Sequence, residues 1–326
     1  MLDQNQRLRI VIPGGSGQVG RLLAAYFQQQ GHHVTVFTRG PFAAPWQTVH
    51  WDGEHPGEWA EHLEGADVCI NLAGRSVNCR YTRKNREAIY RSRIHTTQLL
   101  GRVITSLAHP PAVWLNASTA TIYRHALDRP MDEFNGEIGG HEAIGAVADD
   151  SDPWNFSIKV ATDWERAFFA APTPGTRKIA MRTAVVMSPT AGPFPIYLNL
   201  VRFSLGGTQG NGRQFISWIH ELDFARSVEF LIARDDIDGI VNIGSPNPLP
   251  NRDFMAEMRE AYGMPNGIPA FAPLLELAAF FHRTETELLL KSRRVVPARL
   301  LEAGFDFQFP EWREAAEDLV RQWRNR

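Results

Sequence analysis

The sequence predicts an α/β fold, in which a doubly wound parallel sheet is accompanied by a smaller, mostly helical C-terminal domain. Residues 8–39 provide the first observation: an apolar run, a glycine-rich turn, an amphipathic helix and a second apolar run follow in that order, which is a βαβ unit. The second observation is that short apolar runs alternate with helical periodicity further along the chain. We expect residues 1–187 and about 214–244 to form the sheet domain, and residues 188–213 and 245–326 the smaller one.

Composition and charge exclude several classes of protein. A net charge of −2 argues against a general nucleic-acid binder, which is usually basic. No apolar run is long enough to span a bilayer, and the polar start MLDQNQRLR does not resemble a signal peptide, so we expect no membrane partner and a cytoplasmic location. Cys69 and Cys79 are expected to be buried thiols, and the histidines lack ligand spacing, so no metal is predicted. The sequence predicts no particular oligomeric state.

The glycine-rich turn lies between the first predicted strand and the first predicted helix. Two registers fit it, GxxGxxG from Gly14 and GxGxxG from Gly15. Residues without a Cβ let the backbone approach a pyrophosphate, and the free N–H groups of the following helix would face it. Glycines also occur in turns for backbone reasons alone, but the strand–turn–helix context favours a dinucleotide-binding, Rossmann-type domain. The predicted cofactor turn is Gly14, Gly15, Ser16, Gly17, Gln18, Val19 and Gly20.

The second strand, predicted at 33–37, is followed by Thr38 and Arg39, which we expect to contact the cofactor. A site selective for NAD is expected to have an acidic residue here for the ribose 2′-hydroxyl, and the sequence has none. Arg39 instead offers a planar cation that suits a 2′-phosphate, so we predict NADP(H). The alternative is that Arg39 is a solvated residue at a strand end.

Two further strand ends are candidate cofactor contacts. Asp52 follows a short strand predicted at 48–51, and it either accepts a hydrogen bond from the adenine amino group or is a turn aspartate before Gly53. The buried strand predicted at 67–72 runs into Ala73-Gly74, where small residues would let the chain pass close to the cofactor.

A long helix is predicted at 82–108, and its first half is basic. The basic residues near it are Arg80, Arg83, Lys84, Arg86, Arg91 and Arg93. They form either a solvated face or a rim that attracts an anionic cofactor or substrate.

The strand predicted at 111–116 leads into Ser118 and Thr119, and Tyr123 follows. Hydroxyls at the carboxyl end of a parallel strand lie where open α/β sheets bind ligands, so these are candidate catalytic residues. The alternative for the Ser and Thr is local hydrogen bonding in a turn. Residues 124–152 are rich in Gly, Asp and Glu without clear periodicity, and we interpret them as a lid.

Seven segments of the chain share a pattern known from other proteins. They are GGSGQVG at 14–20, VTVFTR at 34–39, INLAG at 70–74, SRIHTTQLL at 92–100, GRQFISWIH at 212–220, VNIGSPNP at 241–248 and RRVVPARLLEAGF at 293–305. In these segments the chain resembles the atypical extended short-chain dehydrogenases, often called the epimerase family. The last three are specific to a subgroup with a small helical C-terminal domain.

The resemblance implies a cofactor site but no particular substrate. It implies that NADP(H) is bound by Gly14, Gly17, Gly20 and Arg39, with Leu72, Ala73 and Gly74 beside the nucleotide. In typical short-chain dehydrogenases a Tyr-x-x-x-Lys pair carries the proton, but the corresponding positions here hold Ser157 and Ala161. Lys159 should face elsewhere on its helix. Tyr123 is the best remaining proton donor, and the alternative is that it is a core tyrosine.

The resemblance favours an NADP(H)-dependent oxidoreductase or epimerase-like enzyme, with Ser118 or Thr119 polarising a small carbonyl or hydroxyl substrate. The alternative is a catalytically inactive NADP-binding sensor or protein-interaction module. The absence of the Tyr-Lys pair favours this alternative. The chain departs from its relatives at Arg75, where an acidic residue is usual, and at TAGPFP after Ser188, which replaces a glycine pair. Both positions should border the substrate pocket, which favours a changed substrate.

Overall fold

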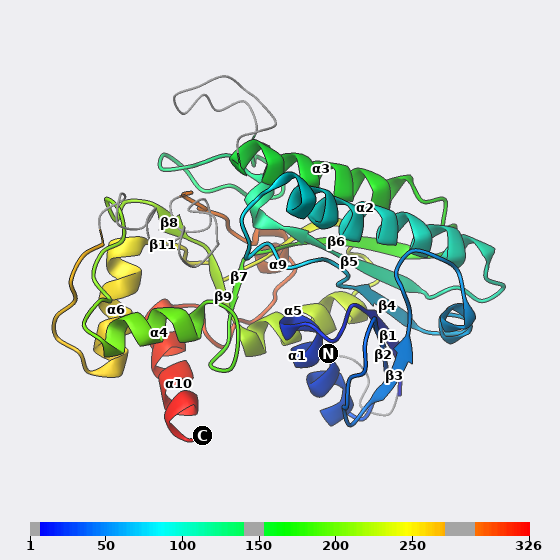
Figure 1. Cartoon of the computed structure of the whole chain (residues 1–326), viewed down its shortest axis with the longest axis horizontal. Helices are drawn as coiled ribbons and strands as arrows, with labels where there is room; N and C mark the ends of the chain where they lie inside the picture. The colour runs from blue at the N-terminus through cyan, green and yellow to red at the C-terminus, as the bar shows by residue number, and fades with distance from the viewer. Residues whose placement is uncertain (1–6, 140–152, 271–290) are drawn as a thin grey trace.

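The computed structural model describes residues 7–139, 153–270 and 291–326, and its centre is a seven-stranded parallel sheet (Figure 1). The strand order is β10-β6-β5-β4-β1-β2-β3. The strands are β1 (Arg9–Pro13), β2 (His33–Thr38), β3 (Gln47–His50), β4 (Val68–Asn71), β5 (Val113–Thr119), β6 (Arg177–Thr183) and β10 (Gly239–Ile243). The order changes direction between β1 and β4, as in a doubly wound sheet. The predicted fold class is confirmed.

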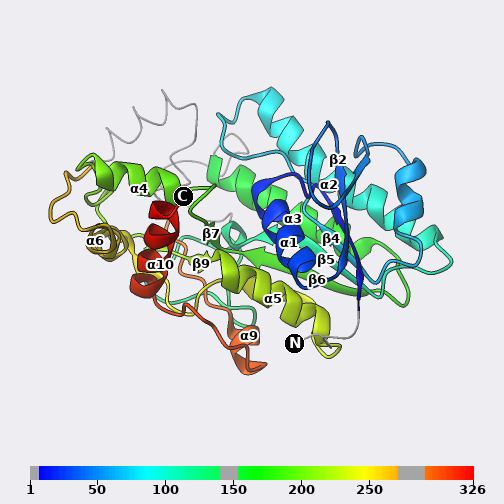
Figure 2. The ribbon, with the colours of Figure 1, turned by 90° about the horizontal axis from the view of Figure 1, so that it is seen from below.

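Helices cover both faces of the sheet. α1 (Gln18–Gln29) and α5 (Glu221–Ala233) lie on one face, and α2 (Arg83–Ser106) and α3 (Pro153–Ala170) lie on the other (Figures 1 and 2). Within β1, Ile10 and Ile12 belong to the core under α1 and α5, whereas Val11 belongs to the core on the α2 side. Because both faces are covered, successive residues of the strand are apolar.

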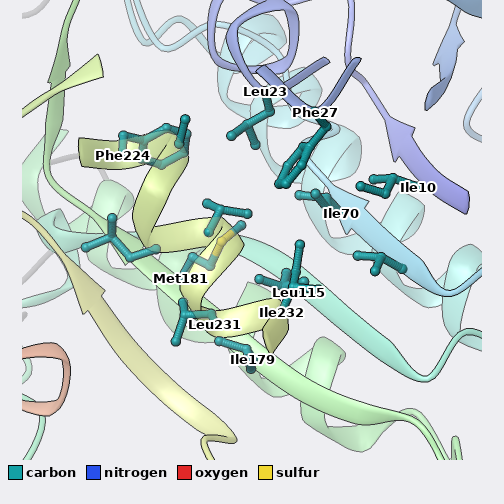
Figure 3. Packing of buried hydrophobic residues seen from close by; sticks show 14 of the residues in the cluster. Ile10, Leu23, Phe27, Ile70, Leu115, Ile179, Met181, Phe224, Leu231 and Ile232 are labelled. Atoms are coloured by element: carbon teal, nitrogen blue, oxygen red, sulfur yellow. The ribbon is translucent and has the colours of Figure 1, made fainter. Parts of the chain in front are cut away.

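The core between the sheet, α1 and α5 fixes the position of the glycine turn (Figure 3). Leu23 and Phe27 of α1 are fully buried there, beside Phe224 of α5. Burial of each such side chain stabilises the fold by about 1.5–3 kcal/mol. The helix that follows the turn is therefore held rigidly against the sheet.

The remaining elements lie outside the main sheet and the four helices that cover it. They are α4 (Phe194–Arg202), α6 (Asn251–Tyr262), α9 (Ala298–Glu302), α10 (Trp312–Arg324), the 3-10 helices η1 (Glu58–His62) and η2 (Ala120–Ile122), and the short strands β7 (Val185–Met187), β8 (Phe215–Ile216), β9 (Trp218–His220) and β11 (Leu249–Pro250). The indole of Trp312 stacks on Phe254 at 4.1 Å, which joins α10 to α6. The division into two domains remains a prediction.

The mostly apolar residues at 177–187 predict a single strand, and this prediction is wrong in one respect. The chain leaves the main sheet after Thr183, and Val185–Met187 pairs in parallel with Trp218–His220 instead. The Val185 N–H donates to the Ser217 carbonyl, so pairing with β9 diverts the chain from the main sheet. Of the segment interpreted as a lid, residues 140–152 lie outside the described residues.

Within the described ranges, no helix has both the length and the apolar character needed to cross a membrane. The same ranges contain no group of three or more His, Cys, Asp or Glu side chains that could hold a metal ion. Cys69 is a buried free thiol as expected, whereas Cys79 is a free thiol that is only partly buried.

Candidate functional site

Two adjoining cavities lie at the carboxyl ends of the parallel strands. The first has a volume of about 790 Å³ and is lined by residues that follow β1, β2 and β4 and by one face of α2. The second has a volume of about 360 Å³ and is lined mainly by the start of α1, the end of β5, α2 and α3. Gly74 lines both cavities. They occupy the edge at which open α/β sheets bind ligands.

The residues of the predicted cofactor turn divide between these cavities and the core. Gly14, Ser16 and Gly17 line the first cavity, and Gln18 and Val19 line the second. Gly15 and Gly20 line neither.

The glycines of the turn are required for different reasons. A Cβ on Gly20 would lie 2.4 Å from the Gly15 Cα, so these two residues let α1 pack closely on the turn. Gly14 has φ +76°, and a Cβ there would lie 2.6 Å from the Ala73 Cα. Among the described residues, a Cβ on Gly17 would meet only the Gly14 carbonyl at 3.7 Å, so no contact within them requires a glycine at 17.

The N-terminus of α1 is open toward the first cavity. Gly17 is the N-cap residue, and no side chain caps the first turn of the helix. Those N–H groups and the positive end of the helix dipole can bind an anionic group. An approaching pyrophosphate is therefore the feature that would explain a residue without a side chain at Gly17.

Thr38 and Arg39 both line the first cavity, but their side chains differ. The Thr38 hydroxyl donates to the Gly40 carbonyl at 3.2 Å, so it belongs to the local turn. Arg39 is exposed, and within the described part of the chain its guanidinium has no carboxylate partner. It is thus available for a phosphate.

The basic half of α2 contributes to both cavities rather than to one continuous face. Lys84 and Arg91 line the first cavity, and Arg93 lines the second. Arg86 instead stacks over the Phe156 ring at 4.8 Å, and Arg83 is exposed and lines neither cavity. The first cavity has an excess of cations: Arg39, Arg75, Lys84, Arg91 and Arg102 line it with the carboxylates Asp52, Glu54 and Glu87. This excess favours an anionic ligand.

Asp52 lines the first cavity, but its contacts are those of a turn aspartate. Oδ1 accepts hydrogen bonds from the N–H groups of Glu54 at 2.7 Å and His55 at 2.9 Å, and Oδ2 lies 2.7 Å from His55 Nδ1. These bonds hold the pKa of Asp52 well below its usual range. We therefore favour the turn interpretation over the adenine contact.

A buried polar network positions Leu72, Ala73 and Gly74. The Asn71 Oδ1 accepts from the Ala73 N–H at 3.1 Å, and Asn71 Nδ2 donates to Asn116 Oδ1 at 2.7 Å and to Thr97 at 3.2 Å. Asn71 and Thr97 are fully buried. This network was not predicted from the sequence, although an Asn at the end of an otherwise apolar strand was its signal. Leu72 lines the second cavity and Ala73 the first.

Ser118 and Thr119 both line the second cavity. The Ser118 hydroxyl donates to Glu165 Oε1 at 2.6 Å, and Glu165 forms a buried ion pair with Arg182 at 2.7 Å. Thr119 Oγ1 accepts from the Thr121 N–H at 3.1 Å, and the described residues offer its hydroxyl hydrogen no acceptor. Thr119 can therefore donate a hydrogen bond to a ligand, whereas the Ser118 hydrogen is already engaged.

The structure argues against Tyr123 as a proton donor. Its side chain is 1% exposed and lines neither cavity. The hydroxyl donates to Asn242 Oδ1 at 3.0 Å, and burial raises the pKa of the phenol. Arg182 stacks on the ring at 4.9 Å. The alternative of a core tyrosine fits this arrangement, because the chain turns inward through η2 after Thr119.

Another tyrosine, Tyr81, lines the second cavity and was not considered from the sequence. Its hydroxyl lies 3.5 Å from Ser157 Oγ, and its ring packs edge-on against Phe156 at 5.2 Å. Ser157 and Ala161, at the positions of the typical Tyr-Lys pair, also line this cavity. Lys159 is half-exposed and pairs with Asp163, as expected from its helical position. The Tyr81 phenol, which comes from the segment before α2, thus lies next to Ser157, the position at which typical short-chain dehydrogenases have their catalytic tyrosine.

The two positions that depart from the family pattern lie at different cavities. Arg75 lines the first, and its guanidinium donates to Asn85 Oδ1 at 2.9 Å. From the segment after Ser188, Pro193 lines the second cavity, and a Cβ on Gly192 would lie 2.6 Å from the Gln18 amide. This segment therefore covers the start of α1.

Comparison with known proteins supports the family suggested by this geometry. A sequence model of the NAD dependent epimerase/dehydratase family matches residues 10–141, and a domain of unknown function (DUF1731) matches residues 268–319. The mouse (Mus musculus) epimerase family protein SDR39U1 is 31% identical over 321 residues, which covers 96% of this chain and 100% of that protein. The chain belongs to the epimerase family. The resemblance stated from its seven segments is therefore confirmed.

Other members of the epimerase family are similar over equal lengths. The family protein SERP0438 of Staphylococcus epidermidis is 29% identical over 313 residues, covering 96% of this chain and 99% of that protein. The crystal structure of human SDR39U1 with NADPH has a TM-score of 0.82 and 28% identity, covering 96% of this chain and 99% of that chain. The cofactor in that crystal structure is the one predicted here from the sequence.

Proposed function

We propose that this member of the epimerase family is an NADP(H)-dependent oxidoreductase or epimerase-like enzyme acting on a small carbonyl or hydroxyl substrate. One observation carries the proposal. The Thr119 hydroxyl lines an apolar cavity that adjoins, through Gly74, a larger cavity with a glycine turn and excess positive charge. A dinucleotide in the larger cavity would thus approach a substrate held beside Thr119.

The residues of the first cavity fit a dinucleotide with a 2′-phosphate. Gly17 leaves open space where a pyrophosphate would approach the first turn of α1, and Arg39, which pairs with no carboxylate of the described residues, supplies a cation at the end of β2. The human relative crystallised with NADPH supports the same assignment. Bound NADPH would supply a hydride to the substrate carbon.

Thr119 and Tyr81 have complementary roles in this proposal. Thr119 donates a hydrogen bond to the substrate oxygen, where negative charge develops as the carbon accepts a hydride. The Tyr81 hydroxyl then gives its proton to that oxygen, and Ser157, 3.5 Å from it, lies on the path by which a proton returns. Tyr81 replaces Tyr123 because it lines the second cavity and Tyr123 does not.

A second candidate remains, a cofactor-binding sensor or interaction module without catalysis. The observation that favours it concerns Ser157 and Ala161. They line the second cavity at the positions of the typical Tyr-Lys pair, and neither side chain can act as that pair does. A partner protein whose affinity changes between the NADPH and NADP⁺ complexes would support this candidate.

Two measurements test the proposal in order. Calorimetric titration with NADPH and NADH at matched ionic strength tests the cofactor, and tight NADPH binding with weak NADH binding is expected. Oxidation of NADPH by a panel of aldehydes, ketones and 2-oxo acids then tests catalysis, with Thr119→Ala as the matched variant of strongly reduced activity. Failure to bind either nucleotide would refute both candidates, whereas binding without turnover on any carbonyl would favour the sensor.

A further inference from the structure

Arg93 is the only charged side chain among the described residues that line the second cavity. Most of the lining is apolar or aromatic, and it includes Val77, Ile89, Phe156, Val160 and Trp164. The other polar groups are hydroxyls and the Gln18 amide. The cavity therefore presents one positive charge on an otherwise neutral, largely apolar surface.

The Arg93 guanidinium is fixed in place but has no counter-ion among the described residues. Its Nη1 donates to the carbonyls of Arg75 at 3.0 Å and Ile89 at 3.2 Å, and its Cζ lies 5.2 Å from the centre of the Trp164 ring. No carboxylate in the described part of the chain pairs with it, and the Nε and Nη2 groups donate to no described acceptor. A planar donor pair of this kind suits a carboxylate.

The burial of the Arg93 side chain also favours an anionic ligand. The Arg93 side chain is half-buried, and loss of solvent lowers the pKa of Arg93 to about 10, although Tyr81 and Cys79 act in the opposite direction. Arg93 thus remains charged at neutral pH, and no carboxylate in the described ranges offsets its lost hydration. An anion in the cavity would offset it.

The neighbours of Arg93 hold the cation at the junction of the two cavities. The Trp164 Nε1–H donates to Thr97 at 2.8 Å, which fixes the ring beneath the guanidinium. A Cβ on Gly74 would lie 3.3 Å from the Arg93 Cζ, so the glycine leaves room for the cation. The second cavity, at about 360 Å³, is near the lower end of the range for small-molecule sites.

We infer that the second cavity takes a small substrate with an apolar body and one carboxylate, and that Arg93 binds this carboxylate. The inference rests on the proposed function and specifies its substrate class. A single cation balances one negative charge, and the apolar walls suit a hydrocarbon or aromatic body. A nucleoside-diphosphate sugar, which carries two charges and a polar sugar, fits this lining less well.

The test uses a pair of probes that differ only in charge. 3-Phenylpropanoate and its neutral amide, 3-phenylpropanamide, are titrated into the full-length protein saturated with NADPH, and uridine diphosphate serves as the nucleotide probe. We expect the carboxylate to bind at least about tenfold more tightly than the amide. We expect Arg93→Gln to remove this preference, while Arg93→Lys retains part of it and Arg83→Gln, an exposed site on the same helix, leaves it unchanged.

The outcomes separate the inference from the proposed function. Equal binding of the two probes to the unmodified protein, or tighter binding of uridine diphosphate, would overturn the inference while NADPH binding stands. If Arg93→Gln weakens NADPH binding as much as it weakens binding of the carboxylate probe, Arg93 would be assigned to the cofactor instead. If Arg93→Gln does not fold, the inference is still tested by the preference of the unmodified protein for the carboxylate over the amide and by its partial retention in Arg93→Lys. Absence of NADPH binding would refute the proposed function itself.

Discussion

The Ser118 hydroxyl donates its hydrogen bond to Glu165 over 2.6 Å, and this bond distinguishes Ser118 from the neighbouring Thr119. Glu165 is held from its other side by Arg182, whose Nη2 lies 2.7 Å from Oε2. Both members of the ion pair are buried. Two adjacent hydroxyls at one strand end are therefore not equivalent: one completes a structural network, and the other is available to a ligand.

This difference predicts unequal effects of two similar substitutions. Thr119→Ala should lower kcat by about 100-fold, because it removes the donor to the developing oxyanion. Ser118→Ala should lower it by less than about tenfold, because the pair between Glu165 and Arg182 persists without the serine. Both variants should bind NADPH like the unmodified protein. Equal losses of kcat would show that the hydroxyls act together.

The glycine turn predicts that two Gly→Ala substitutions will fail in different ways. Gly20→Ala places a methyl group 2.4 Å from the Gly15 Cα and should destabilise the fold by about 1–3 kcal/mol in urea unfolding. Gly17→Ala meets only the Gly14 carbonyl at 3.7 Å, and its stability should change by less than about 1 kcal/mol.

NADPH binding should nevertheless be weakened at least about tenfold by Gly17→Ala, since the new methyl group would occupy the space of the pyrophosphate. Calorimetry of the folded variant measures this directly. Unchanged affinity in Gly17→Ala would mean that the turn binds no nucleotide backbone at this residue.

Much of the fold and of the first cavity follows from local sequence pattern. The strand–turn–helix order, the apolar runs and Arg39 lie within a single βαβ unit, where spacing along the chain determines spacing in the structure. The second cavity was harder to predict, because its walls come from segments far apart in the sequence. Tyr81, Arg93 and Ser157 meet only after α2 and α3 pack against each other.

Tyr123 illustrates the same limit of prediction from the sequence. Tyr123 is closer in sequence to Thr119, but the 3-10 turn at Ala120–Ile122 directs it into the core. No periodicity in the sequence reveals that turn. Likewise, the mostly apolar sequence at 177–187 cannot show that hydrogen bonding to the Ser217 carbonyl diverts the chain after Thr183.

The two tyrosines give a direct test of the proton donor. Tyr81→Phe should lower kcat by about 100-fold or more, because the cavity loses its phenol hydroxyl while the ring remains to pack against Phe156. Tyr123→Phe is the matched control, and it should leave kcat nearly unchanged, since the Tyr123 hydroxyl lines neither cavity and interacts with buried Asn242 and Arg182. The opposite ranking would return the role to Tyr123. NADPH affinity should be the same in both variants.

Arg39 predicts the basis of cofactor selectivity. Arg39→Ala should weaken NADPH binding by about tenfold or more and leave NADH binding unchanged, because only NADPH carries the 2′-phosphate. Arg83→Ala, which removes a cation that lines neither cavity, controls for general electrostatics. Calorimetry at two salt concentrations measures both. An unchanged ratio of NADPH to NADH affinity would show that Arg39 is only a solvated residue.

His220 predicts how stability depends on pH. It caps the N-terminus of α5: its Nδ1 accepts from the Leu222 N–H at 3.1 Å, and its Nε2 lies 3.2 Å from Asp318. Protonation of Nδ1 would abolish the cap. Burial lowers the pKa of His220 below its ordinary value of 6.5, although Asp318 and Asp223 act in the opposite direction.

Because the unfolded chain binds this proton more readily, the contribution of His220 to stability is present above pH 6.5 and is lost as the pH falls through the lower folded pKa. His220→Asn, which keeps a capping side chain, should therefore lose less stability between pH 7.5 and 5.5 in urea unfolding, whatever its absolute stability. The exposed His55 is the opposing control: Asp52 raises its pKa, so His55→Asn should make stability fall more steeply with acid. An identical acid dependence in His220→Asn and the unmodified protein would contradict the assignment.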